Sequence, residues 1–502
     1  MSSVFLHSPD PKLTNLLEGL FISYGTVTPS EGAYDAIIHW KGNFADSENL
    51  NGYPGFILNR PEMLVKVQDK SYVRQTFVRN GLLLDSSQRA GKMDTFVGSK
   101  YIVPVFHLRA IALYVCETKG LLLSSQSNLK SVYRGIGLED VSKTVKKIIS
   151  DAIRAVYCLG LDFGIVKIRL NASGQTISVD VNPQPKLTKP LAQLFAKAIH
   201  DFDMEIRTEL TNKQQVMMGM DPEFILRGTD GKVVPASKFL KRKGQVGSDA
   251  IHIGNRRVIY PLVELRPEPS PDPRQLVTNL INTMHMAAGK ITDTSLKWNA
   301  GGMPVKGFPL GGHLHLSNIW LNSELLRVLD NYLALPLTLI EDSTTRLRRP
   351  GFGALGDFRR QPHGGFEYRT LPSWLVSPRI TKGVIALTLV IAEHYRQLRR
   401  RPLEDERVLA AYFNIEKVEP EEQTDPLRKN DFLVNVINII WVDLEKLSAY
   451  KHYIHYLEPL RKQMTEQQRW DEQRDFRRVW KIKPYTDEIK NKPTFRDIIE
   501  RV

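Results

Sequence analysis

Cysteine is nearly absent from this 502-residue chain, in which only Cys116 and Cys158 occur. Two cysteines cannot build the disulfide frameworks of small secreted proteins or the thiolate sets of structural zinc sites. The chain does not need such links, because hydrophobic residues make up 42% and charged residues 25% of it, which is ordinary for a globular protein. We therefore expect a reducing, intracellular setting and, from the length, two or three domains.

Long apolar runs and targeting signals are also missing. No apolar run reaches the ~18 residues that a membrane-spanning helix requires. The first residues, MSSVFLHSPDPKLTN, lack the basic stretch followed by an apolar stretch that marks a secretory signal. The sequence therefore predicts no membrane span and a cytoplasmic protein.

Negative charge is in deficit, and the formal net charge is +14 at pH 7. A positive excess can indicate nucleic acid, an anionic surface or an acidic substrate as partner. The chain has no RNA-recognition signature, no zinc finger and no basic stripe interleaved with aromatic residues. A phosphate-handling active site together with solvated basic helices explains the charge, and we predict no specific nucleic-acid partner. A nucleic-acid-binding factor remains an alternative that rests on charge alone.

Four short stretches in the second half of the chain each have the pattern of a β-strand and carry two polar groups two residues apart. They cover residues 220–224, 263–267, 312–316 and 366–370. Residues i and i+2 of a strand point to the same face. If the four strands share one sheet, one face collects the following side chains: Asp221, Glu223, Glu264, Arg266, His313, His315, Glu367 and Arg369.

A face of this kind is costly to bury unless its charges are paired or bind a metal ion. Carboxylates and imidazoles are suitable ligands for a divalent metal, and arginine suits a phosphate or carboxylate. The alternative is four amphipathic strands with ordinary solvated outer faces. The recurrence of the same spacing and the same mixed chemistry favours a site.

The first 205 residues alternate strand-like and helix-like patterns. Residues 3–6, 36–40 and 55–60 are candidate strands, and residues 14–20 and 61–78 are candidate helices, the second of which is closed by Gly81. Alternation of this type predicts a parallel α/β unit.

Several motifs in this part resemble those of ATP-grasp ligases, and in particular of the endospore coat-associated family. They are residues 34–40, 58–60, Asp69-Lys70 followed by a helix and Gly81, residues 100–106, Gly160-Leu161-Asp162-Phe163-Gly164, and residues 179–185. The resemblance implies that Asp180 and Asn182 on the last strand face a metal-bound nucleotide. The alternative is that the two residues form a turn-capping pair before Pro183.

The chain departs from the ATP-grasp pattern at two places. Lys167 stands where the preceding strand normally supplies an acid, and the stretch between Gly81 and Lys100 is too short for the usual glycine-rich phosphate lid. We therefore predict that residues 1–208 form a reduced ATP-grasp-like domain. Loss of its own catalysis is the favoured interpretation, and catalysis of a related ligation is the alternative.

The four strand motifs, in their order along the chain, resemble the glutamine-synthetase-like carboxylate–amine ligases, and most closely the phage-type amidoligases called carboxylate–amine ligase type 2. The resemblance covers about residues 215–400. Its most specific parts are Gly219-Met220-Asp221-Pro222-Glu223-Phe224, residues 264–267, residues 311–315 and residues 365–374.

This resemblance implies an enzyme that forms an amide bond between a carboxylate and an amine through an acyl phosphate, with ATP and Mg²⁺ (or Mn²⁺) as cofactors. The implied metal ligands are Glu223, Glu264, His313, Glu367 and Asp221. The implied nucleotide ligands of the chain are His315 and Arg349, together with Asp180 and Asn182 of the first domain. His315 could also be a further metal ligand.

Arginines are the candidates for stabilising phosphate or the substrate carboxylate, and they are Arg266, Arg369, Arg359 and Arg346. For each arginine of the loop 347–360 and its neighbours, a solvated surface charge is the alternative. The substrates that we expect are a small-molecule or peptide carboxylate and an amine. A homo-oligomer stays open, because sites of this type sometimes lie between subunits.

The predicted architecture is mixed α/β and α+β. It consists of the ATP-grasp-like domain (1–208), a carboxylate–amine ligase domain with an antiparallel sheet and helices (209–402), and a helical C-terminal extension (403–502), in which we find no chemistry. A non-catalytic structural or coat-associated protein that retains a ligase fold is the alternative function. The sequence does not identify the acid, the amine or the oligomeric state.

Overall fold

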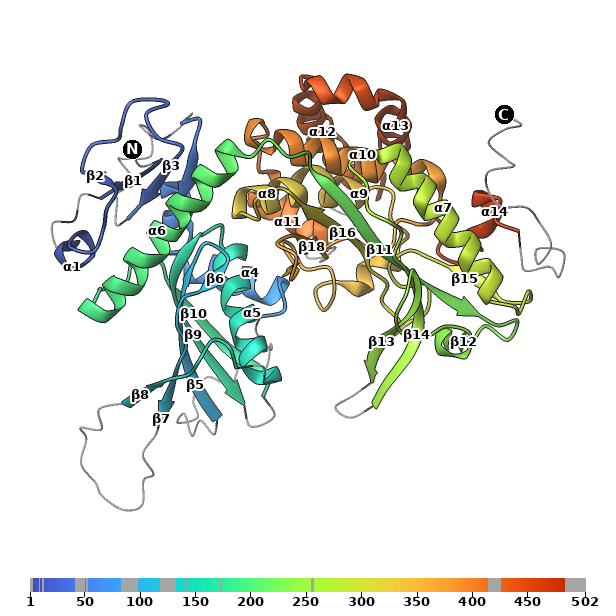
Figure 1. Ribbon diagram of the computed structural model, residues 1–502, viewed down its shortest axis with the longest axis horizontal. Coiled ribbons are helices and arrows are strands. Elements are labelled where there is room, and N and C mark those ends of the chain that lie inside the picture. Colours follow the sequence, from blue (N-terminus) through green and yellow to red (C-terminus); the bar gives the residue numbers. More distant parts are fainter. Residues whose placement is uncertain are drawn as a thin grey trace, which may run out of the picture. The chain divides into compact units, whose positions relative to one another are not determined.

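The structure is a computed structural model that describes residues 3–8, 10, 13–40, 50, 53–82, 98–117, 132–140, 142–171, 174–253, 257–413 and 426–483. It divides into two compact units. The first comprises Met1–Lys213 and Trp320–Arg327, and the second comprises Gln214–Ile319 and Val328–Val502. Each unit has its own sheets, shown with their helices in Figure 1.

The first unit begins with a four-stranded sheet of order β2-β1-β3-β4, in which every neighbouring pair is parallel. Its strands are β1 (Val4–His7), β2 (Ser23–Gly25), β3 (Ala36–His39) and β4 (Phe56–Leu58), with the helices α1 (Thr14–Leu17), α3 (Pro61–Lys66) and α4 (Lys70–Arg79). The predicted parallel α/β unit is confirmed. The single helix expected over residues 61–78 is wrong, because Asp69 caps a new helix by accepting a hydrogen bond from Ser71 N at 2.7 Å.

A second sheet of the first unit is antiparallel, with the order β10-β9-β5-β7-β8 and β6 beside β5. Its strands are β5 (Gly98–Phe106), β6 (Arg109–Ala110), β7 (Tyr114–Glu117), β8 (Val132–Gly135), β9 (Phe163–Asn171) and β10 (Thr176–Asn182). Helix α5 (Lys143–Cys158) contacts β5, β9 and β10, and α6 (Lys189–Thr211) follows. The stretch expected to be too short for a phosphate lid lies mostly outside the described residues.

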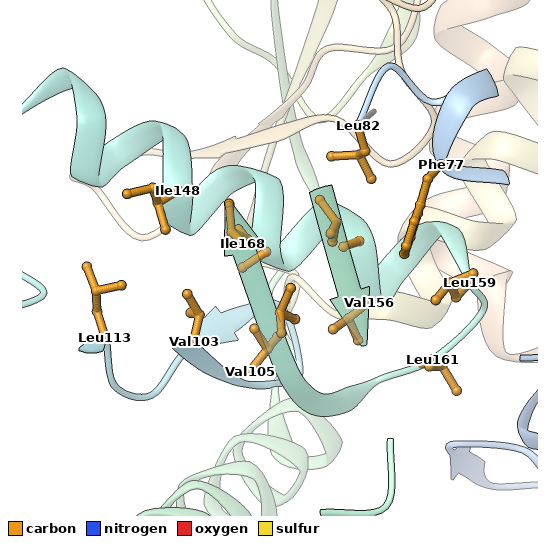
Figure 2. Close-up of a cluster of buried hydrophobic side chains, with 14 of the residues drawn as sticks. Phe77, Leu82, Val103, Val105, Leu113, Ile148, Val156, Leu159, Leu161 and Ile168 are labelled. Carbon is orange, nitrogen blue, oxygen red and sulfur yellow. The ribbon is translucent and has the colours of Figure 1, made fainter. Parts of the chain in front are cut away.

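The core of the first unit lies between α5 and this antiparallel sheet. Ile148 and Val156 of α5 point toward Val103 of β5 and Ile168 of β9, and Figure 2 shows these side chains meeting. Alternate residues of β9 are buried under the helix, as expected for a sheet with one covered face. Helix α5 therefore covers one face of this sheet.

The second unit is built on an eight-stranded sheet of order β13-β14-β11-β16-β18-β17, with β12 and β15 paired to β11. Its strands are β11 (Met217–Arg227), β12 (Val233–Val234), β13 (Val246–Ile253), β14 (Arg257–Leu265), β15 (Lys297–Asn299), β16 (Gly312–Ser317), β17 (Phe358–Arg360) and β18 (Phe366–Tyr368). The four stretches singled out in the sequence are thus neighbours in one sheet, on β14, β11, β16 and β18. The neighbouring strands of this sheet pair in antiparallel orientation throughout the described residues.

Helices of the second unit complete its core. They are α7 (Pro273–Lys290), the π-helix η4 (Asp330–Ala334), α9 (Leu335–Leu337), α10 (Pro378–His394), α11 (Glu406–Phe413), α12 (Pro426–Glu445), α13 (Ser448–Thr465) and α14 (Arg477–Trp480), with short 3₁₀ turns η3 (Ala236–Lys238), η5 (Thr345–Arg348), η6 (Tyr395–Gln397) and η7 (Pro402–Glu404). Helix α8 (Ser323–Leu329) lies mostly in residues 320–327, which count with the first unit. Asp272 caps α7 by accepting a hydrogen bond from Arg274 N. The helical segment that follows α8 is irregular and forms a π-helical turn from Asp330.

The predicted mixed α/β class, with an antiparallel sheet in the second half and a helical C-terminal part, is confirmed. Among the described residues, no helix has the length and apolar character that crossing a membrane would require.

We predict that truncating the core of the first unit destabilises that unit. Ile148 is fully buried against the sheet, so Ile148→Ala should lower the free energy of unfolding by about 2–5 kcal/mol through lost burial and the cavity left behind. Urea denaturation followed by circular dichroism measures this change. Lys146→Ala, on the exposed side of the same helix, is the matched control and should change it by less than about 0.5 kcal/mol. Equal effects of the two substitutions would contradict the packing described here.

Candidate active site

The register of the sheet places the polar residues of four strands side by side on one face. Asp221 stands opposite His313, and Glu223 stands opposite Glu264. Glu367 is the partner of His315 on one side and of Arg359 on the other. Directly paired residues of an antiparallel sheet project to the same face. The residues that alternate with them, such as Met220, Phe224, Leu314 and Tyr368, are apolar and buried.

Asp221 lies at the centre of the polar face and contacts both histidines. Its Oδ1 atom is 3.1 Å from Nδ1 of His313, and its Oδ2 atom is 3.3 Å from Nε2 of His315. Asp221 Oδ1, His313 Nδ1 and His315 Nε2 are all buried and have no hydrogen-bond partner among the described residues. A group of buried polar atoms that face one another without hydrogen bonds is expected where a bound ion completes the set.

Glu367 is buried and anchors the basic end of the face. Arg359 holds its carboxylate with two hydrogen bonds, of 2.8 Å from Nε and 2.7 Å from Nη2. Arg369 donates a further one from Nε at 3.1 Å, and Gln361 donates one from Nε2 at 3.0 Å. Because the side chain of Arg359 is 56% exposed and that of Arg369 is 35% exposed, both guanidinium groups still present N–H groups to solvent.

Glu223 is tied to the residues that precede β16. Its Oε2 atom accepts a hydrogen bond from Gly311 N at 2.6 Å, and its own N–H donates to the carbonyl of Gly311 at 2.9 Å. A side chain at position 311 would collide with the ring of His313. Glycine at this position therefore allows the backbone to pass close to both Glu223 and His313.

Glu264 forms an ion pair with Arg266, two residues further along the chain. Arg266 lies just after β14 and also donates from Nη1 to the carbonyl of Gly244 at 3.0 Å. Its guanidinium occupies the space above Gly247, the cross-strand partner of Glu264, where a Cβ atom would collide with it. The space that Gly247 leaves for Arg266 depends on the pairing of β13 with β14, so residue spacing along the chain does not reveal it.

The buried charges shift one another's pKa values in opposite directions. Burial opposes ionisation of Asp221, but the charge of His313 outweighs it and holds the pKa of Asp221 well below its usual range. Burial is likewise outweighed at Glu367, where His313 and Arg359 lower the pKa to about 2. Burial would lower the pKa of His313, but Asp221 raises it to about 10. This part of the face is therefore an ionised network at neutral pH.

The other two carboxyls behave differently. Burial raises the pKa of Glu223 to about 7. Burial, and then the charge of Asp221, raises the pKa of Glu264 to about 9. Asp249, on β13, adds negative charge that raises both values. At this end of the face burial therefore favours the neutral carboxyls, and a bound cation would favour their ionised form.

The donor set fits a divalent metal ion. One ligand atom from each of Asp221, His315 and Glu367 lies within 4.8 Å of the others. Among the described residues, these three form the group of acidic and histidine side chains that could hold a metal ion. The carboxylate oxygens suit Mg²⁺ or Mn²⁺, and the imidazole nitrogen suits a transition-metal ion. Of the predicted metal ligands, Asp221 and Glu367 belong to this group, and His313 contacts both of them. Glu223 and Glu264 lie next to it on β11 and β14, and His315, predicted mainly as a nucleotide ligand, lies within it.

The loop arginines are placed differently from one another. Arg359 reaches the polar face, as described above. The side chain of Arg349 is only 4% exposed and forms two hydrogen bonds to Glu341, of 2.8 and 2.6 Å, so its guanidinium is committed to a structural pair. Arg346 is exposed. The predicted nucleotide role of Arg349 and the phosphate role of Arg346 therefore stay predictions, without a contact to the face.

Asp180 and Asn182 belong to the first unit and lie on β10. Asp180 is the cross-strand partner of Lys167, with 3.8 Å between their charged atoms, and both side chains are largely exposed. The side chain of Asn182 accepts a hydrogen bond from Gln184 N at 3.1 Å across Pro183. Asn182 thus acts as a turn cap, which was the alternative to a nucleotide role.

A family model described as phage phiEco32-like COOH.NH2 ligase-type 2 matches residues 218–482. The chain belongs to this ligase family. The match covers β11, β14, β16 and β18 and therefore the whole polar face. It also runs past residue 402, the predicted end of the ligase domain, through α13 and α14.

No curated protein matches the chain. Solved structures that it matches include the ATP-grasp ligase PsnB complexed with a minimal precursor, at 12% identity over 39% of this chain and 100% of that chain, with a TM-score of 0.26. The macrocyclase MdnC from Microcystis aeruginosa MRC, bound with the precursor peptide MdnA, matches at 10% identity over 39% and 99% of the two chains, with a TM-score of 0.29. The Plasmodium falciparum glutamine synthetase matches at 9% identity over 75% and 94%, with a TM-score of 0.31. At these TM-scores the likenesses carry no argument about this chain, and the endospore coat-associated resemblance stays a prediction.

We predict that binding of Mn²⁺ to the polar face releases protons and becomes tighter as the pH rises from about 6 to about 9. Metal ligands bind in their deprotonated form. Glu223, with a pKa of about 7, and Glu264, with a pKa of about 9, are both protonated at the lower pH in the metal-free protein. Calorimetric titration in two buffers of different ionisation enthalpy measures the number of protons released.

The matched control for this titration is Glu264→Gln, which cannot lose a proton at that position. It should release fewer protons than the wild type at about pH 8. Binding that is independent of pH, with no proton release, would show that these two carboxyls do not respond to the metal.

Proposed function

We propose that the chain is an ATP-dependent ligase that joins a carboxylate to an amine through an acyl phosphate, with its active site on the polar face of the second unit. The observation that carries this proposal is the register that brings Asp221, His315 and Glu367 together beside Arg359 and Arg369. Membership of a COOH.NH2 ligase family supports the same reaction class.

Asp221, His315 and Glu367 would hold the metal ion, with Glu223, Glu264 and His313 around it. When bound, Mg²⁺ or Mn²⁺ neutralises charge on the phosphate oxygens of ATP. The protein keeps this donor set in place by pairing it internally, since His313 lies 3.1 Å from carboxylate oxygens of both Asp221 and Glu367.

The arginines supply the fixed positive charge that phosphoryl transfer requires. Arg359 and Arg369 are oriented by Glu367, and their remaining N–H groups are available to phosphate or carboxylate oxygens. A planar guanidinium that is already held in place loses little entropy on binding such a group. Arg266 is positioned in the same way at the Glu264 end.

The proposed reaction balances as two steps. A carboxylate oxygen of the first substrate attacks the γ-phosphorus of ATP and ADP leaves, which gives an acyl phosphate. The amine nitrogen of the second substrate then attacks the carbonyl carbon, phosphate leaves, and the nitrogen loses a proton to give the amide. Carboxylates of the polar face are the acceptors present in the site for that proton.

The carboxylate and amine substrates are proposed to be small molecules or peptides. For the first unit we propose a supporting role, such as substrate recognition, in place of nucleotide chemistry of its own. The pairing of Asp180 with Lys167 and the turn-capping contact of Asn182 favour this assignment, because both predicted nucleotide ligands are engaged in local contacts.

A Mg²⁺-dependent assay of ADP release tests the proposal, with a panel of amino acids, amines and short peptides as substrates. Glu367→Gln removes the charge that holds Arg359 and Arg369 and one metal ligand, so turnover should fall by at least about 100-fold. Asn182→Ala in the first unit should change turnover by less than about threefold.

The reverse pattern, with activity lost in Asn182→Ala and kept in Glu367→Gln, would place the chemistry in the first unit and refute the assignment. The absence of both turnover and nucleotide binding in the wild type would favour a non-catalytic protein that retains a ligase fold.

A further inference from the structure

Glu472 is a buried carboxylate in the C-terminal part of the second unit, where the sequence showed no chemistry. It lies in the segment between α13 and α14, and it is 0% exposed. Burial of a carboxylate lowers stability unless its oxygens accept hydrogen bonds or pair with a cation. The groups that donate to Glu472 therefore indicate its role.

Both oxygens of Glu472 accept hydrogen bonds from two separate segments. Oε1 accepts from Gly302 N at 2.5 Å and from Oγ1 of Thr345 at 2.5 Å. Oε2 accepts from Met303 N at 2.8 Å and from Oγ1 of Thr344 at 2.9 Å. These donors are neutral backbone N–H groups and hydroxyls, whereas the carboxylates of the polar face are paired with arginines. The carboxylate of Glu472 therefore links residues 302–303 to residues 344–345.

The first segment, residues 301–303, continues towards Glu223. Leu310 N donates to the carbonyl of Gly302 at 2.9 Å, and the next residue, Gly311, donates its N–H to Oε2 of Glu223 at 2.6 Å. A displacement of residues 301–303 would therefore reach the carboxylate of Glu223 through this short stretch.

A second connection runs from the same segment through Ser373. Its N–H donates to the carbonyl of Gly301 at 3.0 Å, and its hydroxyl donates to the carbonyl of Glu223 at 2.5 Å. Gly301 has a φ of +118°, and a Cβ atom there would collide with Glu472. Glycine is thus required for the close approach of Glu472 to this backbone.

The other segment leads to the opposite end of the polar face. Thr345 is the first residue of η5, and Arg348 is the last. The buried guanidinium of Arg348 donates to the carbonyl of Thr370 at 2.8 Å and to that of Arg369 at 3.4 Å. Arg369 in turn donates to Glu367 at 3.1 Å.

We propose that Glu472 is a positioning residue of the active site, which fixes the Glu223 end and the Arg369 end of the polar face relative to each other. It touches neither the metal ligands nor the guanidinium groups that face solvent, and it acts through residues 301–303 and 344–345. The proposal rests on the ligase function proposed above, since that function defines what must be positioned.

Glu472→Gln is the test substitution, because glutamine keeps the size of the side chain and one acceptor oxygen. Its amide places a donor where either Met303 N or Gly302 N already donates, so one of the two segments must move. Because displacements of about 1 Å can cost up to ~100-fold in rate, we expect kcat to fall by ~10–100-fold, with a change of less than about threefold in KM for ATP. Glu466→Gln, on an exposed residue nearby, is the matched control and should leave both unchanged.

Thr345→Val separates positioning from folding. It removes the hydroxyl that donates to Oε1 of Glu472 but leaves the hydrogen bonds of Glu472 to residues 302 and 303. If both residues act through one network, the double substitution with Glu472→Gln should lower kcat by less than the product of the two single effects. Thermal unfolding of all variants must show that each is folded at the assay temperature.

Mn²⁺ titration of the same variants gives a readout that does not require the substrates. Glu472→Gln should weaken Mn²⁺ binding by about three- to tenfold through the displaced Glu223, whereas Glu466→Gln should not. A shift in Mn²⁺ affinity, together with a wild type that neither turns over any substrate nor binds nucleotide, would support the positioning role and reject the ligase function. A lowered melting temperature with unchanged kcat and unchanged Mn²⁺ affinity, or a wild type that neither binds Mn²⁺ nor turns over, would overturn the positioning role.

Discussion

The pairing of β11 with β16 on one side and with β14 on the other is the constraint on which the rest of the second unit depends. It places Asp221 against His313 and Glu223 against Glu264. A slip of one residue in either pairing would turn the carboxylates towards the apolar layer formed by residues such as Phe224 and Leu314. Because a buried charge without a partner costs several kcal/mol, the fold is stable only in the register that also builds the site.

This register also separates two kinds of charge along the sheet. Towards β17, Glu367 is surrounded by Arg359, Arg369 and His313, and its pKa is lowered to about 2. Towards β13, burial raises the pKa of Glu264 to about 9, and the charges of Asp221 and Asp249 add to this effect against that of Arg266. The same face therefore offers fixed cations to phosphate or carboxylate at one end and, at the other, carboxyls whose ionised form a bound metal ion would favour.

The sequence predicted the part of this arrangement that depends on local spacing. Two polar residues at i and i+2 in a strand share a face whatever the fold, so Asp221 and Glu223, or His313 and His315, could be found without a structure. Their membership of one sheet was an assumption that the topology confirmed. Gly247 and the commitment of Arg349 to Glu341 could not be predicted, because they depend on which strand or loop lies opposite.

Glu472 shows why the extent of a functional domain is harder to predict than its motifs. Nothing in the residues around position 472 differs from an ordinary charged surface segment, and its burial arises only because the C-terminal part packs against residues 301–303 and 344–345. The family match to residue 482 includes this segment. A polar face whose residues must be held to within fractions of an ångström depends on the contacts that fix their backbone as much as on the residues themselves. The C-terminal segment is then part of the ligase unit in the physical sense, because it provides the acceptor that joins the two ends of the face.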